Sequence, residues 1–131
     1  MRLKDKTAII TGGGSGIGLA TARAFCKEGA KVILFGRRKE KLVSAANELG
    51  DSVLFVQGDM TKNDDLDKLI NKTLNNFKGI DILVNSAGLF NGAPLHEISD
   101  SQWDEMMDIN IRSVFQLTRR VLPIMMAQKS G

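Results

Sequence analysis

Five glycines lie within seven positions of the stretch TGGGSGIG, residues 11–18. The stretch follows a short apolar run and opens a helical pattern, so its backbone N–H groups stand at a helix N-terminus, where a phosphate group is favoured. A Walker A loop is excluded because Gly18 is followed by Leu and Ala rather than by Lys and Ser or Thr. A strict G-x-G-x-x-G does not fit either. Two interpretations stay open: a phosphate-binding loop, or a tight strand-to-helix turn that binds nothing.

Two arginines, Arg37 and Arg38, follow the second apolar run of the chain. Dinucleotide sites place here, roughly 20 residues beyond the glycine loop, the side chain that contacts the adenosine ribose, and an acid at this point favours NAD. This chain has no acid there, and guanidinium groups suit a 2′-phosphate. We therefore expect NADP(H) rather than NAD(H), with Arg37 as the main contact and Arg38 as a lesser one. The alternative is that the two side chains face solvent.

Three further polar residues stand where a site could use them. Asp59 and Asn85 follow the third and fourth apolar runs, although either could simply form a turn. Asn110 lies on the apolar stripe of a long helical pattern, where a buried amide must be hydrogen-bonded. It is therefore either a satisfied structural residue or a polar group presented to a site.

Composition excludes several classes of protein. One cysteine and one histidine allow neither an internal disulfide nor a histidine–cysteine metal cluster, so no metal site is expected. The net charge of +3 comes from bases interleaved with acids, and the chain has no tyrosine for base stacking, which argues against a nucleic-acid partner. No apolar run reaches membrane-spanning length and no signal peptide opens the chain, so we expect a cytoplasmic protein without a membrane partner.

Strand-length apolar runs alternate with helical patterns along the chain. The expected strands are rich in branched residues and cover Thr7–Thr11, Lys31–Phe35, Ser52–Val56 and Ile80–Val84. The expected helices between them carry one apolar stripe each, end before a glycine, and cover Gly16–Glu28, Lys39–Leu49 and Asn63–Lys78. Alternation of this kind predicts a doubly wound parallel α/β sheet of Rossmann type, with strand order 3-2-1-4, in a single domain over residues 1–131.

A long helix follows the fourth strand, from a capping box at Ser99 to about Gln128. Its main apolar stripe is predicted to contain Trp103, Met107, Asn110, Val114, Leu117, Val121 and Ile124. A second apolar side carries Phe115, Leu122 and Met126, so we expect one side to cover the sheet and the other to accept a partner helix.

Taken together, these motifs resemble those of the short-chain dehydrogenase/reductase family. TGGGSGIG matches the family's T-G-x-x-x-G-x-G cofactor loop, GD at Gly58-Asp59 matches the acid that contacts the adenine, and Asn110 matches its structural-catalytic asparagine. NSAG matches the family's N-N-A-G, with Ser86 as a mild departure. The cofactor-binding residues implied by the resemblance are Gly12, Gly14, Ser15, Gly16, Ile17, Gly18, Arg37, Arg38, Asp59, Met60, Asn85, Ala87 and Gly88.

The resemblance implies hydride transfer between a nicotinamide dinucleotide and a carbonyl or alcohol. The family's Ser, Tyr and Lys would lie beyond the fourth strand and its long helix, where this chain stops, and only Asn110 of the catalytic tetrad is present. We therefore expect the truncated, cofactor-binding half of such an enzyme, inactive alone and able to act on substrate only if completed. The alternative is a non-catalytic binding protein that pairs with a relative. In either case we expect a homo-oligomer, formed through the long helix or the exposed fourth strand.

Overall fold

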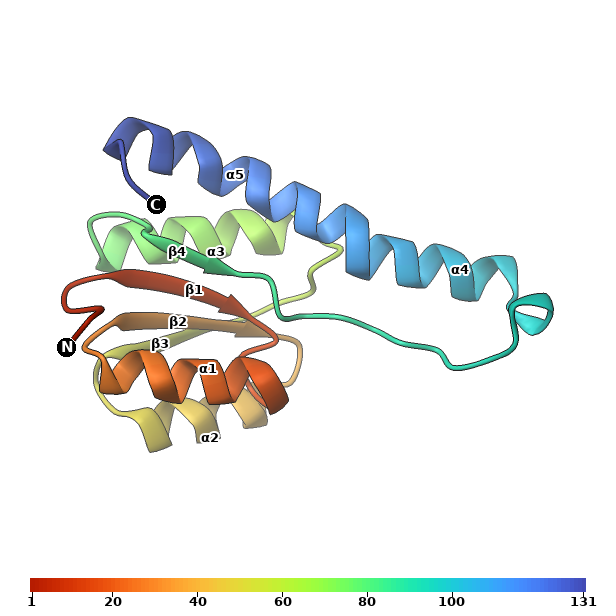
Figure 1. Cartoon of the computed structure of the whole chain (residues 1–131), viewed down its shortest axis with the longest axis horizontal. Coiled ribbons are helices and arrows are strands. Elements are labelled where there is room, and N and C mark those ends of the chain that lie inside the picture. The colour runs from red at the N-terminus through yellow and green to blue at the C-terminus, as the bar shows by residue number, and fades with distance from the viewer.

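The fold is built on a four-stranded parallel sheet, and the computed structural model describes all 131 residues. The strands are β1 (Thr7–Thr11), β2 (Lys31–Gly36), β3 (Val53–Gln57) and β4 (Ile82–Val84). Their order is β3-β2-β1-β4, which confirms the predicted topology (Figure 1). β1 pairs with β2 from Thr7 opposite Lys31, and with β4 from Ala8 opposite Ile82.

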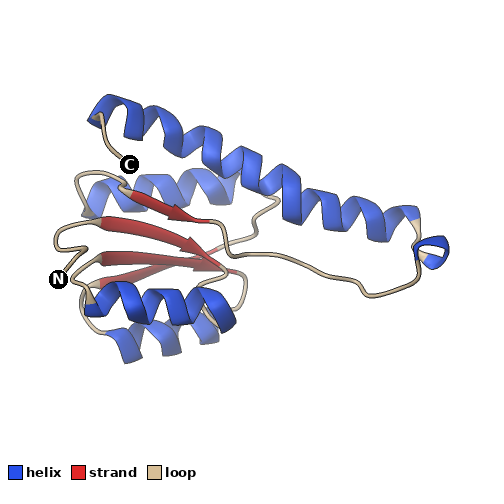
Figure 2. Ribbon diagram, in the orientation of Figure 1, coloured by secondary structure: helices blue, strands red, loops and turns tan.

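Helices cover both faces of the sheet (Figure 2). α1 (Gly16–Lys27) and α2 (Lys39–Leu49) lie on one face, and α3 (Asn63–Asn76) and α5 (Ser113–Gln128) on the other. Because alternate strand residues point to opposite faces, each strand feeds two cores. Ile9 and Phe35 pack with Leu66 and Leu117 toward α3 and α5, whereas Ile10 and Leu34 belong to the core under α1 and α2.

The long helical segment is continuous but not uniform. It consists of α4 (Asp100–Met107), a π-helical turn (Asp108–Arg112) and α5, after a short 3-10 turn at Leu95–Glu97. The predicted capping box is confirmed, because Ser99 accepts from the Gln102 N–H at 3.2 Å and the Gln102 side chain accepts from the Ser99 N–H at 2.9 Å.

Two expectations for the helices need correction. α3 ends at Asn76 rather than Lys78, so Gly79 does not directly follow the helix. The predicted buried stripe also fails in its first part, since Trp103 is 52% and Met107 37% exposed. α4 extends beyond the ends of the strands and has no sheet beneath it (Figure 1). Only Leu117 and Val121 of the predicted stripe are fully buried.

Two apolar surfaces remain uncovered. β4 has a neighbour on one side only, so its other edge is open. Large exposed side chains follow α4, the π-helical turn and α5, at Trp103, Met107, Ile111, Phe115, Leu122 and Met126. None of the helices combines the length and the apolar character that a bilayer crossing requires.

Candidate functional site

The glycine stretch turns the chain sharply from β1 into α1. Gly12 has a positive φ of 62°, and a Cβ there would stand 3.1 Å from the Cα of Ala87. A Cβ on Gly18 would run into the carbonyl oxygen of Gly12. The stretch is therefore restricted to glycine both by its conformation and by the close approach of the chain to itself.

The N-terminus of α1 is left open by this turn. Ser15 is the N-cap residue, but its side chain does not cap the helix. The first helical hydrogen bond runs from the Leu19 N–H to the Ser15 carbonyl, so the N–H groups of residues 16–18 have no partner within the helix. These donors and the positive end of the helix dipole make a place for an anion.

Thr11 joins the glycine stretch to the segment that follows β4. Its fully buried hydroxyl accepts hydrogen bonds from the N–H of Ser86 at 3.1 Å and of Ala87 at 3.0 Å, and it donates to the Val84 carbonyl. Ser86 enters this arrangement through its backbone, so the departure from N-N-A-G at this position leaves the contact intact. Thr11 was not among the predicted site residues, although it is the first residue of the T-G-x-x-x-G-x-G motif.

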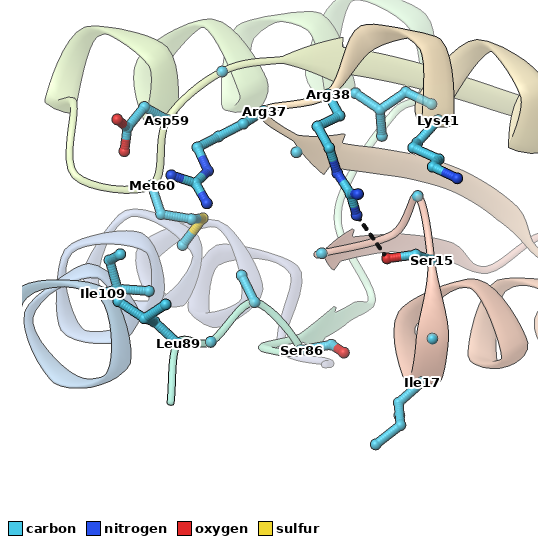
Figure 3. A pocket seen from close by; sticks show the side chains of 18 residues that line it. Ser15, Ile17, Arg37, Arg38, Lys41, Asp59, Met60, Ser86, Leu89 and Ile109 are labelled. Atoms are coloured by element: carbon cyan, nitrogen blue, oxygen red, sulfur yellow. Dashed lines mark hydrogen bonds between the residues drawn. The ribbon is translucent and has the colours of Figure 1, made fainter. Parts of the chain in front are cut away.

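A cavity of about 360 Å³ opens where these segments meet, at the carboxyl ends of the strands (Figure 3). Except for Gly18 and Asn85, every predicted cofactor-binding residue lines it. Gly18 lies beneath the loop as a packing position. The Asn85 amide is exposed and points to Thr118 on α5, 3.5 Å away. The lining residues that sequence reasoning missed are Gly36, Lys41, Leu42, Gly58, Ser86, Leu89 and Ile109.

Three basic side chains line the cavity, and two of them, Arg38 and Lys41, stand at the same end. Arg38 donates to the Ser15 hydroxyl at 3.3 Å, and Lys41 reaches the same region from the first turn of α2 (Figure 3). Arg37 points the other way, toward Asp59 and Met60 (Figure 3). The paired Arg38 and Ser15, beside the open end of α1, form the part of the cavity best suited to a phosphate group.

Asp59 lies at the opposite end, after β3. It accepts hydrogen bonds from the Thr61 N–H and hydroxyl, both at 2.8 Å. Burial alone would raise the pKa of Asp59, but these two bonds and the positive charges of Arg37 and Lys62 outweigh it and hold the pKa below its ordinary value. Asp59 is therefore an ionised hydrogen-bond acceptor near neutral pH.

Asn110 sits within the π-helical turn and does not line the cavity. Its side-chain oxygen accepts from the Leu89 N–H at 2.8 Å, and its amide donates to the Leu89 carbonyl at 2.6 Å. The oxygen and the NH₂ group of the Asn110 amide are thus both hydrogen-bonded to the backbone of Leu89. Because Leu89 lines the cavity, Asn110 fixes the position of the wall formed by residues 86–89.

Comparison with known proteins identifies the family to which this chain is similar. The sequence model of the family described as short chain dehydrogenase matches residues 6–131. An uncharacterized oxidoreductase of Staphylococcus aureus strain MRSA252 is 44% identical over 98% of this chain, and one of Staphylococcus saprophyticus is 40% identical over the same share. The chain spans about half the length of these curated relatives, 56% and 53% respectively.

Solved structures agree with the sequence comparison. A short chain dehydrogenase from Bacillus anthracis superposes with a TM-score of 0.92 at 34% identity, over 98% of this chain and 54% of its own. A 3-ketoacyl-(acyl-carrier-protein) reductase from Brucella melitensis, complexed with NADH, gives 0.89 at 35% identity, over 93% of this chain and 50% of its own. The glycine loop, the strand order and the family match lead to one conclusion: this chain belongs to the short chain dehydrogenase family and carries its nucleotide-binding Rossmann half.

Proposed function

We propose that the chain binds NADP(H) in preference to NAD(H), in the cavity at the carboxyl ends of its strands. The observation that supports the proposal is the set of three basic residues that line the cavity. Arg38, on the Ser15 hydroxyl, and Lys41 lie beside the open N-terminus of α1, and Arg37 lies across the cavity from them. No acid lies at the end of β2 to accept from the two ribose hydroxyls of NAD.

The residues present fit a dinucleotide in three respects. The glycines at positions 12 and 18 remove side chains that would fill the loop. The uncapped N–H groups of α1 supply donors for a pyrophosphate. The ionised Asp59 supplies an acceptor for the amino group of an adenine, as the family resemblance implies.

The family-level chemistry proposed for the whole enzyme is hydride transfer with a carbonyl or alcohol substrate, and the nicotinamide supplies the hydride when bound. Within these 131 residues the role is binding and orientation: Ala87 and Gly88 line the cavity, and Asn110 is the proposed member of the catalytic tetrad. The chain has no tyrosine to act as the family's proton donor. We therefore propose that the chain alone holds the cofactor without turnover. Sustained, nucleotide-dependent reduction of a carbonyl by the purified chain would contradict this.

The cofactor choice is tested by titrating NADPH and NADH into the purified chain and into the variants Arg37→Ala and Arg38→Ala. Loss of a charge-assisted contact to the 2′-phosphate weakens NADPH binding by about 1–3 kcal/mol and leaves NADH nearly unchanged. Lys39→Ala is the matched control, because Lys39 belongs to the same basic run but does not line the cavity. Equal losses for both nucleotides would refute the 2′-phosphate contact.

A second candidate is a non-catalytic interaction protein that self-associates or pairs with a full-length relative. It is favoured by the exposed apolar side chains on α4 and α5 and by the open edge of β4. We expect light scattering at high concentration to give a mass above that of the 14.3 kDa chain. A double substitution, Ile111→Lys with Phe115→Lys, lowers that mass if the helix is the contact and leaves it unchanged if the β4 edge is. A monodisperse monomer would argue against this proposal.

A further inference from the structure

We call the cavity of about 360 Å³ at the carboxyl ends of the strands the nucleotide cavity. A second cavity adjoins it, and Arg37 lines both. Its volume is about 390 Å³, and it lies between the carboxyl end of β3 and the helix α4. Asp59 and Ile109 are also common to the two cavities. Arg37 therefore lies where the two cavities meet.

The wall opposite Arg37 in this second cavity is acidic. Asp104, Glu105 and Asp108 line it from α4 and the π-helical turn. Asp108 already has a cationic partner, Arg112, at 3.1 Å. Asp104 and Glu105 make no side-chain hydrogen bond or ion pair within the chain, and these carboxylates do not gather in a metal-binding arrangement.

Arg37 itself is uncommitted. Its guanidinium forms no ion pair and no hydrogen bond, and only its backbone carbonyl is used, accepting from the Gln57 side chain at 3.0 Å. The side chain points toward Asp59 (Figure 3), and its charge contributes to the lowered pKa of that carboxyl. The guanidinium can therefore turn either to an anion in the nucleotide cavity or to the carboxylates of α4.

We propose that Asp104 and Glu105 compete with the 2′-phosphate of the nucleotide for Arg37, and so limit how strongly the site prefers NADPH over NADH. The proposal rests on the proposed function of the nucleotide cavity. Each carboxylate attracts the guanidinium and repels a bound phosphate, and salt screens both effects over a length of about 8 Å at physiological ionic strength. Asp104 and Glu105 thus influence the preference for NADPH over NADH through Arg37, without lining the nucleotide cavity themselves.

The test is the double substitution Asp104→Asn with Glu105→Gln, which keeps size and removes both charges. Isothermal titration of the full chain is expected to show NADPH binding about three- to tenfold tighter, the sum of two exposed charge interactions, with NADH changed by less than about twofold. Asp100→Asn is the matched control, because Asp100 lies on α4 but lines neither cavity, and it leaves both affinities within about twofold.

The same double substitution in an Arg37→Ala background separates competition for Arg37 from direct repulsion. Competition predicts that the gain for NADPH disappears in that background. A gain of equal size there, or no gain in the wild-type background, overturns the inference. The single substitution Glu105→Gln, with a smaller gain, repeats the test if the double variant does not fold. If the wild-type chain binds neither nucleotide, the proposed function itself fails, whereas nucleotide binding without the predicted gain removes this inference alone.

Discussion

Two side-chain amides hold the segment around β4, one at each end, with the same pattern of bonds. At the start, the Gln128 side chain accepts from the Ile80 N–H and donates to the Ile80 carbonyl, both at 3.0 Å. At the end, Asn110 makes the same pair of bonds to Leu89. We call these the Gln128 clamp and the Asn110 clamp. Each clamp binds a residue that directly follows a glycine: Ile80 follows Gly79, and Leu89 follows Gly88.

The clamps differ in what lies beside them. The Asn110 clamp holds Leu89, which lines the nucleotide cavity, whereas the Gln128 clamp lies at the opposite end of β4 and touches no part of that cavity. Ile80 is fully buried, and the backbone N–H of its neighbour Asp81 donates to the Thr7 carbonyl of β1. Ile80 precedes β4, and its N–H and carbonyl are bonded by the Gln128 side chain rather than by a neighbouring strand. One bonding pattern thus serves the site at one end and the open sheet edge at the other.

The largest expected effect on stability comes from Gln128→Ala. It leaves two backbone groups of a fully buried residue without partners, so the free energy of unfolding falls by about 2–4 kcal/mol, measured by urea denaturation. Gln116→Ala on the same helix removes one side-chain acceptor of Arg120 and costs about 0.5–1 kcal/mol. The NADPH affinity of the folded Gln128→Ala variant stays unchanged. A weakened affinity would contradict the separation of the two clamps.

Asn110→Ala is expected to act on both stability and binding. Leu89 is less buried than Ile80, so the free energy of unfolding falls by a smaller amount, about 1–3 kcal/mol. The wall at Leu89 also loses its anchor, and NADPH binding weakens by about tenfold, equivalent to roughly 1.4 kcal/mol. Asn110→Asp keeps the size and the acceptor for the Leu89 N–H but places an anion against the Leu89 carbonyl, and we expect a similar loss of affinity. Unchanged NADPH affinity in both variants would show that Leu89 needs no anchor.

Gly79→Ala tests the Gln128 clamp from its other side. A Cβ at position 79 would overlap the side-chain oxygen of Gln128, which must then move away from Ile80. The expected loss is about 1–2 kcal/mol, and it is not additive with Gln128→Ala, because both substitutions remove the same bonds. Gly88→Ala places its Cβ 3.3 Å from the Asn110 oxygen, which allows a small adjustment, so we expect a loss below about 1 kcal/mol. Additive losses for Gly79→Ala and Gln128→Ala would show that the glycine acts independently.

Much of the fold could be predicted from local pattern. Runs such as that at residues 31–35 are short and rich in branched residues, and the intervening helices carry one apolar stripe each, so element type and strand order followed from periodicity and connection length. The stripe through Trp103 was wrong because it assumed that sheet lay beneath the whole helix. It also assumed an unbroken 3.6-residue period, which the π-helical turn interrupts.

The site was only partly predictable for a related reason. Motif residues such as Gly12 and Asp59 lie at strand ends, where the carboxyl ends of parallel strands converge. Lys41 lines the cavity because α2 packs beside the glycine stretch, near Gly14. No motif or residue spacing in the sequence predicts this contact. The Gln128 clamp joins residues 48 positions apart, and a polar residue at a helix end is ordinary in sequence. Contacts that depend on tertiary packing therefore could not be predicted from the local periodicity of the sequence.

The smallest expected effect is a dependence on pH that neither clamp shares. Amides do not titrate, whereas the pKa of Asp59 is lowered in the folded chain. Because its folded value lies below the ordinary value of about 3.9, the stabilisation from the ionised carboxylate is fully present above that pH and is lost as the pH falls through the folded value. Urea denaturation between pH 5 and pH 3, a range of roughly one unit on either side of that value, should give parallel curves for wild type, Gln128→Ala and Asn110→Ala. Asp59→Asn makes the curve shallower, and a shallower curve in either clamp variant would mean that its amide supports the Asp59 carboxylate.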